Sequence, residues 1–140
     1  MEPADFLNLD LDLESNEDLT PLANYFSEKA EVLYNGKGGG GYKLTAEPRI
    51  GGHPGSSPEL CTQEMLATLG ELSRDLLLLF RACRSRIFDY GFNGGLAAPP
   101  LSIVLPSAQL ARIAQLEIDL RVTVYPHRLE QPEKKGGGDA

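Results

Sequence analysis

Two segments of the chain alternate strictly between apolar and polar residues, the pattern of a strand with one buried face. Residues 6–13 place on one face Leu7, Leu9, Leu11 and Leu13, and on the other Phe6, Asn8, Asp10 and Asp12. Residues 118–125 place inward Ile118, Leu120, Val122 and Val124, and outward Asp119, Arg121, Thr123 and Tyr125. The pattern therefore predicts a first and a last strand, each with four aliphatic side chains toward the core.

Helical spacing and helix-start residues predict the helices between them. One helix begins near Pro21, a favourable first helical residue, and ends near Lys29. A longer helical stretch spans residues 59–84, and Gly70 marks a break that divides it into two consecutive helices. A brief helix follows at residues 107–116. The second of the consecutive helices is expected to be central to the core, because one side carries Leu76, Leu79, Phe80 and Cys83.

The remaining β-prone segments complete the predicted fold. Residues 31–49 contain two short runs around GKGGGG, which is typical of a hairpin with a flexible tip. Residues 85–92 carry three aromatic side chains on one face, and residues 101–106 predict a short edge strand. The whole pattern indicates an α+β fold, with a mostly antiparallel sheet of four to six strands and helices packed on one face. We expect one domain, residues 1–126, and a disordered C-terminal tail, residues 127–140.

The acidic composition limits the classes of partner. There are 20 Asp and Glu residues against 13 Lys and Arg residues, a formal net charge of −7. This charge opposes nucleic-acid binding and favours the encounter with a basic protein. No segment is long enough to cross a bilayer and the N-terminus carries no secretion signal, so a cytoplasmic location is expected. Cys61 and Cys83 fall on apolar helix faces, which predicts buried, reduced thiols.

The C-terminal half resembles a family of small bacterial α+β domains of unknown function, which are similar in size and charge to immunity proteins. The resemblance rests on a short helix and a final strand that ends in Tyr-Pro, with the signature residues Leu105, Ser107, Leu110, Ile113, Ala114, Leu116, Tyr125 and Pro126. The chain departs from the family pattern at Pro106 and at Glu117, where a Gly turn is usual. The resemblance implies a fold and brings no activity with it.

Carboxylates near the first strand are the main candidates for function. An acidic surface for a basic partner would use Asp10, Asp12, Glu14, Glu17 and Asp18. Alternatively, Asp10 and Asp12 with Asp89 or Asp119 could form an oxygen-ligand site for Mg²⁺ or Mn²⁺. No cofactor is predicted, because the glycine-rich segment lacks the Gly-Lys-Ser/Thr ending of a phosphate loop. Neither histidine has a second ligand at metal-binding spacing, and neither cysteine lies near a histidine in the sequence.

Two functions follow from these residues. The first is a protein-binding module, immunity-like or regulatory, that engages a basic partner and binds neither nucleic acid nor membrane. The second is a small metal-dependent hydrolase that uses the strand carboxylates. The sequence favours the binding module, because it fixes no third metal ligand.

Overall fold

A mixed five-stranded sheet and four helices form the described part of the chain. The computed structural model describes residues 2–50 and 56–127. The elements, in chain order, are β1 (Asp5–Ser15), α1 (Thr20–Lys29), β2 (Glu31–Gly38), β3 (Gly41–Glu47), α2 (Pro58–Gly70), α3 (Arg74–Arg81), β4 (Ser85–Asn93), α4 (Ser107–Gln115) and β5 (Asp119–Tyr125). The α+β class and the mostly antiparallel sheet are confirmed.

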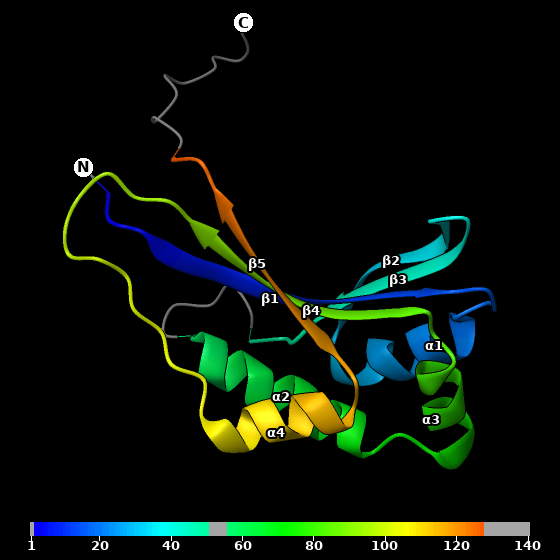
Figure 1. Ribbon diagram of the computed structural model, residues 1–140. Coiled ribbons are helices and arrows are strands. Elements are labelled where there is room, and N and C mark those ends of the chain that lie inside the picture. Colours follow the sequence, from blue (N-terminus) through cyan, green and yellow to red (C-terminus); the bar gives the residue numbers. More distant parts are fainter. Residues whose placement is uncertain (1, 51–55, 128–140) are drawn as a thin grey trace, which may run out of the picture.

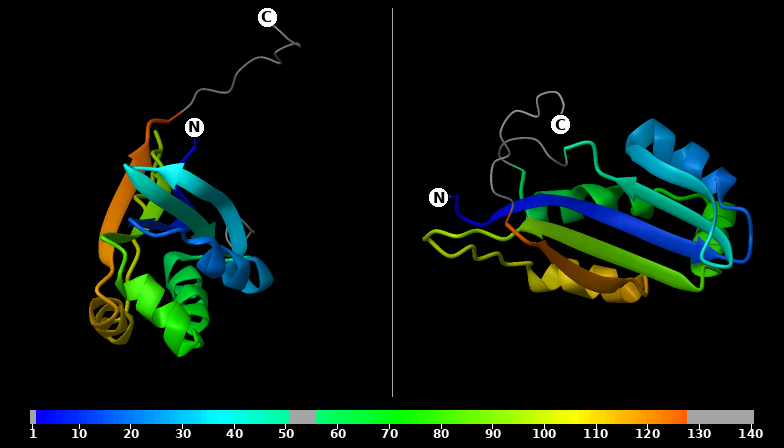
Figure 2. Two further views of the ribbon diagram at one scale, coloured as in Figure 1. Left: turned by 90° about the vertical axis from the view of Figure 1, so that its right-hand side faces the viewer. Right: turned by 90° about the horizontal axis from the view of Figure 1, so that it is seen from above.

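The first strand lies at the centre of the sheet, whose order is β2-β3-β1-β4-β5. β1 pairs antiparallel with β3 and with β4, whereas β4 and β5 are parallel. A parallel pair needs a crossover connection, which the segment containing α4 provides. Figures 1 and 2 show the helices on one side of the sheet, while no described element lies over the other side. We call this uncovered side the open face.

The central strands supply most of the core from the sheet. Their fully buried side chains include Leu9, Leu11, Leu13, Leu44 and Phe88, and they pack in one cluster with buried side chains from all four helices. Tyr90 is also buried, and its hydroxyl lies 2.6 Å from Thr62 Oγ1. Because Thr62 donates its own proton to the Pro58 carbonyl at 2.7 Å, Tyr90 is the donor to Thr62. The core therefore contains a satisfied polar pair that joins β4 to α2.

The two consecutive helices begin at serine caps. The Ser57 hydroxyl accepts a hydrogen bond from the Leu60 N–H, and the Ser73 hydroxyl accepts one from the Leu76 N–H. Each bond satisfies one of the free amides of a helix start. The division near Gly70, which the sequence predicts, is confirmed.

A Schellman motif ends α4. The N–H groups of Glu117 and Ile118 donate to the carbonyls of Ala114 and Ile113, at 2.9 and 3.1 Å. Ile113 and Ile118 are both buried, which is the usual apolar contact of this motif. Glu117 has a φ of 57°, so it occupies the left-handed position that a glycine adopts most easily.

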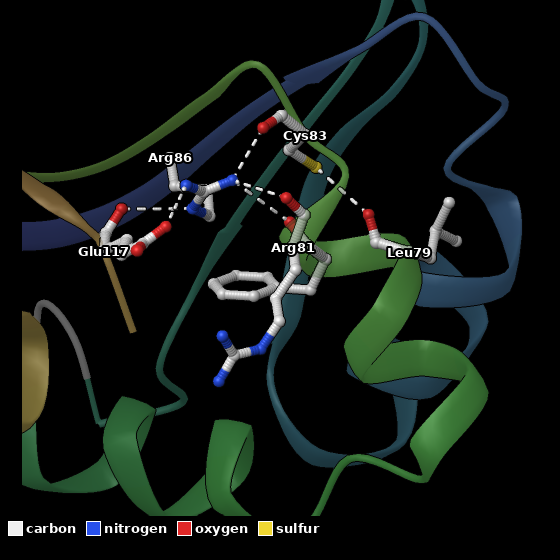
Figure 3. Close-up of polar contacts among 6 residues, drawn as sticks. Leu79, Arg81, Cys83, Arg86 and Glu117 are labelled. Carbon is white, nitrogen blue, oxygen red and sulfur yellow. Dashed lines mark hydrogen bonds and ion pairs between the residues drawn. The ribbon is translucent and has the colours of Figure 1, made fainter. Parts of the chain in front are cut away.

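Arg86 of β4 joins the end of α3 to the turn after α4, as Figure 3 shows. Its guanidinium donates to the carbonyls of Arg81 at 3.1 Å, Cys83 at 2.6 Å, and, at 3.5 Å, Phe80. It also donates to the Glu117 carbonyl at 3.1 Å and pairs with the Glu117 carboxylate at 3.4 Å. The Phe80 and Arg81 carbonyls stand at the negative end of α3, where a cation is favourable. One side chain, only 13% exposed, thus ties three elements together.

The start of β1 departs from the predicted alternation. The β1–β4 pairing shifts register between Phe6 and Asn8, which is a β-bulge at Leu7. Phe6 therefore packs toward the core, with its ring centroid 5.5 Å from that of Phe92, and Leu7 is exposed. The prediction that Leu7 shares the buried face of Leu9, Leu11 and Leu13 is wrong for this reason.

The last strand forms where predicted, but its aliphatic face is not buried. Leu120, Val122 and Val124 are 45%, 63% and 61% exposed, whereas Ile118 is buried. β5 lies at the edge of the sheet and diverges from α4 along its length (Figure 1), so no described helix covers these side chains. The strand predicted at residues 101–106 is absent, and that segment is an irregular part of the β4–α4 connection.

The glycine-rich hairpin is tighter than predicted. β2 and β3 pair from Glu31–Glu47 to Gly38–Gly41, so the strands run into the glycine segment. Gly39 and Gly40, with φ of 63° and 81°, form a two-residue turn of the kind that needs two left-handed residues. The glycines therefore form a compact two-residue turn rather than the predicted flexible tip.

Part of the predicted organisation lies outside the described residues. These include His53 and, apart from its first residue, the predicted tail at residues 127–140. Within residues 2–50 and 56–127, no helix is both long and apolar enough to cross a membrane.

Candidate functional site

The open face gathers polar side chains from four strands. The alternation of β1 places Asn8, Asp10, Asp12 and Glu14 there, because Leu9, Leu11 and Leu13 point into the core. In the sheet register Asp10 is opposite Asp89 of β4, which is opposite Arg121 of β5. On the other side of β1, Asp12 is opposite Thr45 of β3. Strand pairing therefore assembles a site that is scattered in the sequence.

Arg121 pairs with two of these carboxylates. Its guanidinium donates to Asp12 and lies 3.0 Å from Asp89. The free oxygens are also used, since the hydroxyl of Thr45 donates to Asp12 at 3.0 Å and that of Thr123 donates to Asp89 at 2.8 Å. The hydrogen bond from Arg121 to Asp89, the charges of Asp89 and Asp12, and the hydrogen bond to Asp12 raise the pKa of Arg121. The guanidinium is therefore stabilised in its charged form. In this half of the site each oxygen of Asp12 and Asp89 has a donor, although one cation faces two carboxylates.

Asp10 is left without such compensation. Its one described hydrogen bond comes from the Asn8 amide at 3.1 Å, and the same amide donates to Glu47 at 3.3 Å. Burial and the charges of Asp12, Glu47 and Asp89 together raise the pKa of Asp10 to about 7, against the opposing charge of Arg121. Asp10 and Glu47 therefore form a half-buried pair of carboxyl groups on the open face, and neither has an ion-pair partner among the described residues.

The five predicted partner-binding residues lie in two places, three on the open face and two in the turn after β1. Asp10, Asp12 and Glu14 lie on the open face, and Glu14 is near Arg84 with 3.8 Å between the charged atoms. Glu17 and Asp18 lie beyond the strand, in the β1–α1 turn. The Asp18 carboxylate accepts hydrogen bonds from the Thr20 N–H and hydroxyl, and these lower its pKa. Its observed contacts therefore serve the start of α1.

The carboxylates of the predicted metal site are only partly brought together. Asp89 joins Asp10 and Asp12, but Asp119 lies at the start of β5 opposite Ile87. Among the described residues, no group of three or more His, Cys, Asp or Glu side chains is arranged to hold a metal ion. The oxygens of Asp12 and Asp89 already accept from Arg121, Thr45 and Thr123.

Both cysteines are buried and unpaired, as the sequence predicts. Burial raises the pKa of each thiol, Cys61 and Cys83, to about 11. A thiol of this kind is protonated at neutral pH and is a poor nucleophile.

Sequence reasoning missed Glu47 as a member of the site. The alternation in YKLTAE places Thr45 and Glu47 on one face of a strand and Leu44 and Ala46 on the other, so its outward position was visible. Its approach to Asp10 follows from the pairing of β3 with β1, which joins residues more than thirty positions apart. Nothing local in the sequence specifies that pairing.

The chain was compared with protein-family models, with curated proteins and with solved structures, and none of the three comparisons found a match.

Proposed function

We propose that this protein is a protein-binding module, immunity-like or regulatory, and that its open face engages a basic segment of a partner protein. The observation that carries the proposal is the half-buried carboxyl pair of Asp10 and Glu47, which has no ion-pair partner among the described residues. Asp10 is held half-buried among three other carboxylates, and its nearest cation, Arg121, is engaged by Asp12 and Asp89. A Lys or Arg side chain from a partner would supply the missing positive charge.

The position of this charge supports binding more than catalysis. The open face has no described element over it, so an incoming chain can reach it across the whole width of the sheet. The overall charge of −7 would increase the encounter rate with a basic protein. A pair of half-buried carboxylates would then add specificity, because a partner with a cation at that point of the interface would bind more tightly than one without it.

The test compares the intact protein with two variants of equal charge. Asp10→Asn with Glu47→Gln removes two of the carboxylates of the open face, Asp10 and Glu47. Glu28→Gln with Glu59→Gln removes two exposed carboxylates on α1 and α2 and is the matched control. Each tagged protein is used to capture proteins from native lysate at low and moderate salt, and the captured proteins are identified by mass spectrometry.

The proposal expects a basic protein that the intact chain and the control variant retain at moderate salt and that the Asp10/Glu47 variant loses. With the purified partner, association should be slower for the Asp10/Glu47 variant and should depend less on salt. Equal capture by all three proteins, or capture of no basic protein, would contradict the proposal.

A further inference from the structure

The two edge strands of the sheet, β2 and β5, differ in how well they are protected from pairing with another strand. β2 carries a bulge between Val32 and Tyr34, two glycines and Lys37, which are features that discourage pairing with another strand. β5 contains no lysine, proline or glycine, and it pairs with β4 in one unbroken register from Asp119 to Tyr125. The β5 edge is therefore regular and unprotected along seven residues.

One hydrogen bond shows which residues of β5 direct their N–H and C=O groups toward β4. The Tyr125 carbonyl accepts from the Gly94 N–H at 2.8 Å, so Tyr125 faces the β4 side of the strand. Residues two apart in a strand direct their amide groups the same way, and neighbours direct them oppositely. Leu120, Val122 and Val124 therefore direct their N–H and C=O groups away from the sheet, and these are also the exposed aliphatic residues.

We propose that β5 pairs antiparallel with β5 of a second copy of this chain, which would join two five-stranded sheets into one. Placing Val122 opposite Val122 of the second copy sets Leu120 opposite Val124 on both sides of the two-fold axis. All three pairs are of the hydrogen-bonded kind, and their side chains form one aliphatic stripe. On the open face the same register sets Arg121 opposite Thr123 and Asp119 opposite Tyr125, so no like charges meet.

Neighbouring registers are less favourable. A shift toward the start of the strand places Arg121 opposite Arg121, and like charges directly opposite are destabilising. A shift toward the end brings Pro126, which has no N–H, opposite Leu120 and removes an interstrand hydrogen bond. Of these three alignments, the one centred on Val122 is the most favourable for β5.

The helix layer has a matching apolar surface at this edge. Gln109 and Arg112 of α4 face α2, since Gln109 donates to the Glu59 carbonyl and Arg112 lies close to Gly70. Helical geometry places Leu110 and Ala114 on the other side of α4, and Leu110 is 41% exposed. In the proposed dimer the second copy would cover Leu110 as well as the aliphatic face of β5.

The test measures mass and cross-linking. Sedimentation of the intact chain should give about 30 kDa, twice the 15.2 kDa of one chain. Val122→Lys sets two cations face to face and should raise the dimer dissociation constant by at least about tenfold, whereas Val122→Thr should remain dimeric. Val122 is mostly exposed in one chain, so circular dichroism should show the same fold for all three proteins.

Cysteine variants test the register itself. Val122→Cys should form an intermolecular disulfide under mild oxidation, because the Cα atoms of a directly opposed pair are about 5.5 Å apart. Leu120→Cys should not, since the two cysteines would be four positions apart along the pair of strands. A monomeric intact chain, a dimer that Val122→Lys leaves unchanged, or equal cross-linking of both cysteine variants would each overturn the proposal. The outcome is independent of the proposed function, because the open face stays uncovered in this dimer.

Discussion

At the scale of single residues, Asp10 makes stability depend on pH in the direction opposite to that of a salt-bridged acid. Its folded-state pKa of about 7 lies above its ordinary value of 3.8. Between these values the folded chain retains a proton that the unfolded chain has lost, so the Asp10 contribution to stability decreases as pH rises from about 4 to about 7. Above about pH 7 Asp10 is ionised in both the folded and the unfolded chain, so its contribution to stability no longer changes with pH.

Asp10→Asn should therefore stabilise the protein at pH 8 by roughly 1–2 kcal/mol, a value that includes solvent screening of a half-exposed group. The advantage should disappear near pH 4, where the carboxyl is protonated in both states. Urea unfolding of the variant and the original chain at each pH measures the difference. Glu28→Gln, on the exposed surface of α1, should show no such trend, and an Asp10→Asn variant no more stable than the original at pH 8 would disprove this account.

Glu117 is a second residue that limits stability, in this case through its backbone conformation. Its left-handed conformation strains any residue with a Cβ atom, and its carboxylate is mostly exposed where it pairs with Arg86. Glu117→Gly should therefore stabilise the fold by about 0.5–1 kcal/mol, after the greater freedom of glycine in the unfolded chain is counted. Glu117→Gln keeps the strain and loses the charge, so thermal unfolding should show it unchanged or slightly less stable. Destabilisation by Glu117→Gly would mean that the ion pair outweighs the backbone strain.

At the scale of elements, the guanidinium of Arg86 takes the place of a cap for α3. Arg86→Met retains the aliphatic stem and leaves the carbonyls of Arg81, Cys83 and Glu117 without their donor. The expected loss is about 2–4 kcal/mol, and Arg86→Lys should lose less because one ammonium can keep part of the contacts. Arg81→Met, which alters an exposed arginine on the same helix, is the control and should change stability by less than about 0.5 kcal/mol. Equal urea midpoints for Arg86→Met and Arg81→Met would contradict the structural role of Arg86.

Which elements the sequence could predict depends on whether their signals are local. The starts of α2 and α3 were predictable because Ser57 and Ser73 cap them within three residues. The bulge at Leu7 was not, because it depends on the partner strand, where Gly91 lies opposite Asn8. A Cβ atom at Gly91 would meet the Asn8 amide oxygen at 2.8 Å, so a glycine leaves room for the Asn8 side chain, and the two residues are more than eighty positions apart.

The same distinction explains what was predictable of the site and of β5. Alternation correctly placed Asp10 and Asp12 on the polar face of β1, but their neighbours Glu47 and Arg121 depend on long-range strand order. Alternation also gave the correct two faces of β5. It could not show that β5 is an edge strand, and this position leaves Val122 and Val124 exposed.

At the scale of the whole molecule, the excess of acidic residues should make stability depend on salt. Seven uncompensated negative charges repel one another in the compact state, and the open face concentrates part of this repulsion at Asp10 and Glu47. Raising NaCl from about 20 mM to about 500 mM shortens the screening length to a few ångströms and should raise the melting temperature by a few degrees at pH 8. The increase should be smaller at pH 5, because Asp10 is then protonated in the folded state.

The variants of the open face locate the origin of this salt dependence. Asp10→Asn with Glu47→Gln should remove much of the increase at pH 8, while Glu28→Gln with Glu59→Gln changes the net charge equally and should remove less. Differential scanning calorimetry at one protein concentration measures the melting temperature, so that the variants are compared under the same conditions of dimer formation. If both double variants reduced the increase equally, net charge alone would explain it. A larger effect of the Asp10/Glu47 pair would mean that the open face holds concentrated charge which a basic partner would neutralise on binding.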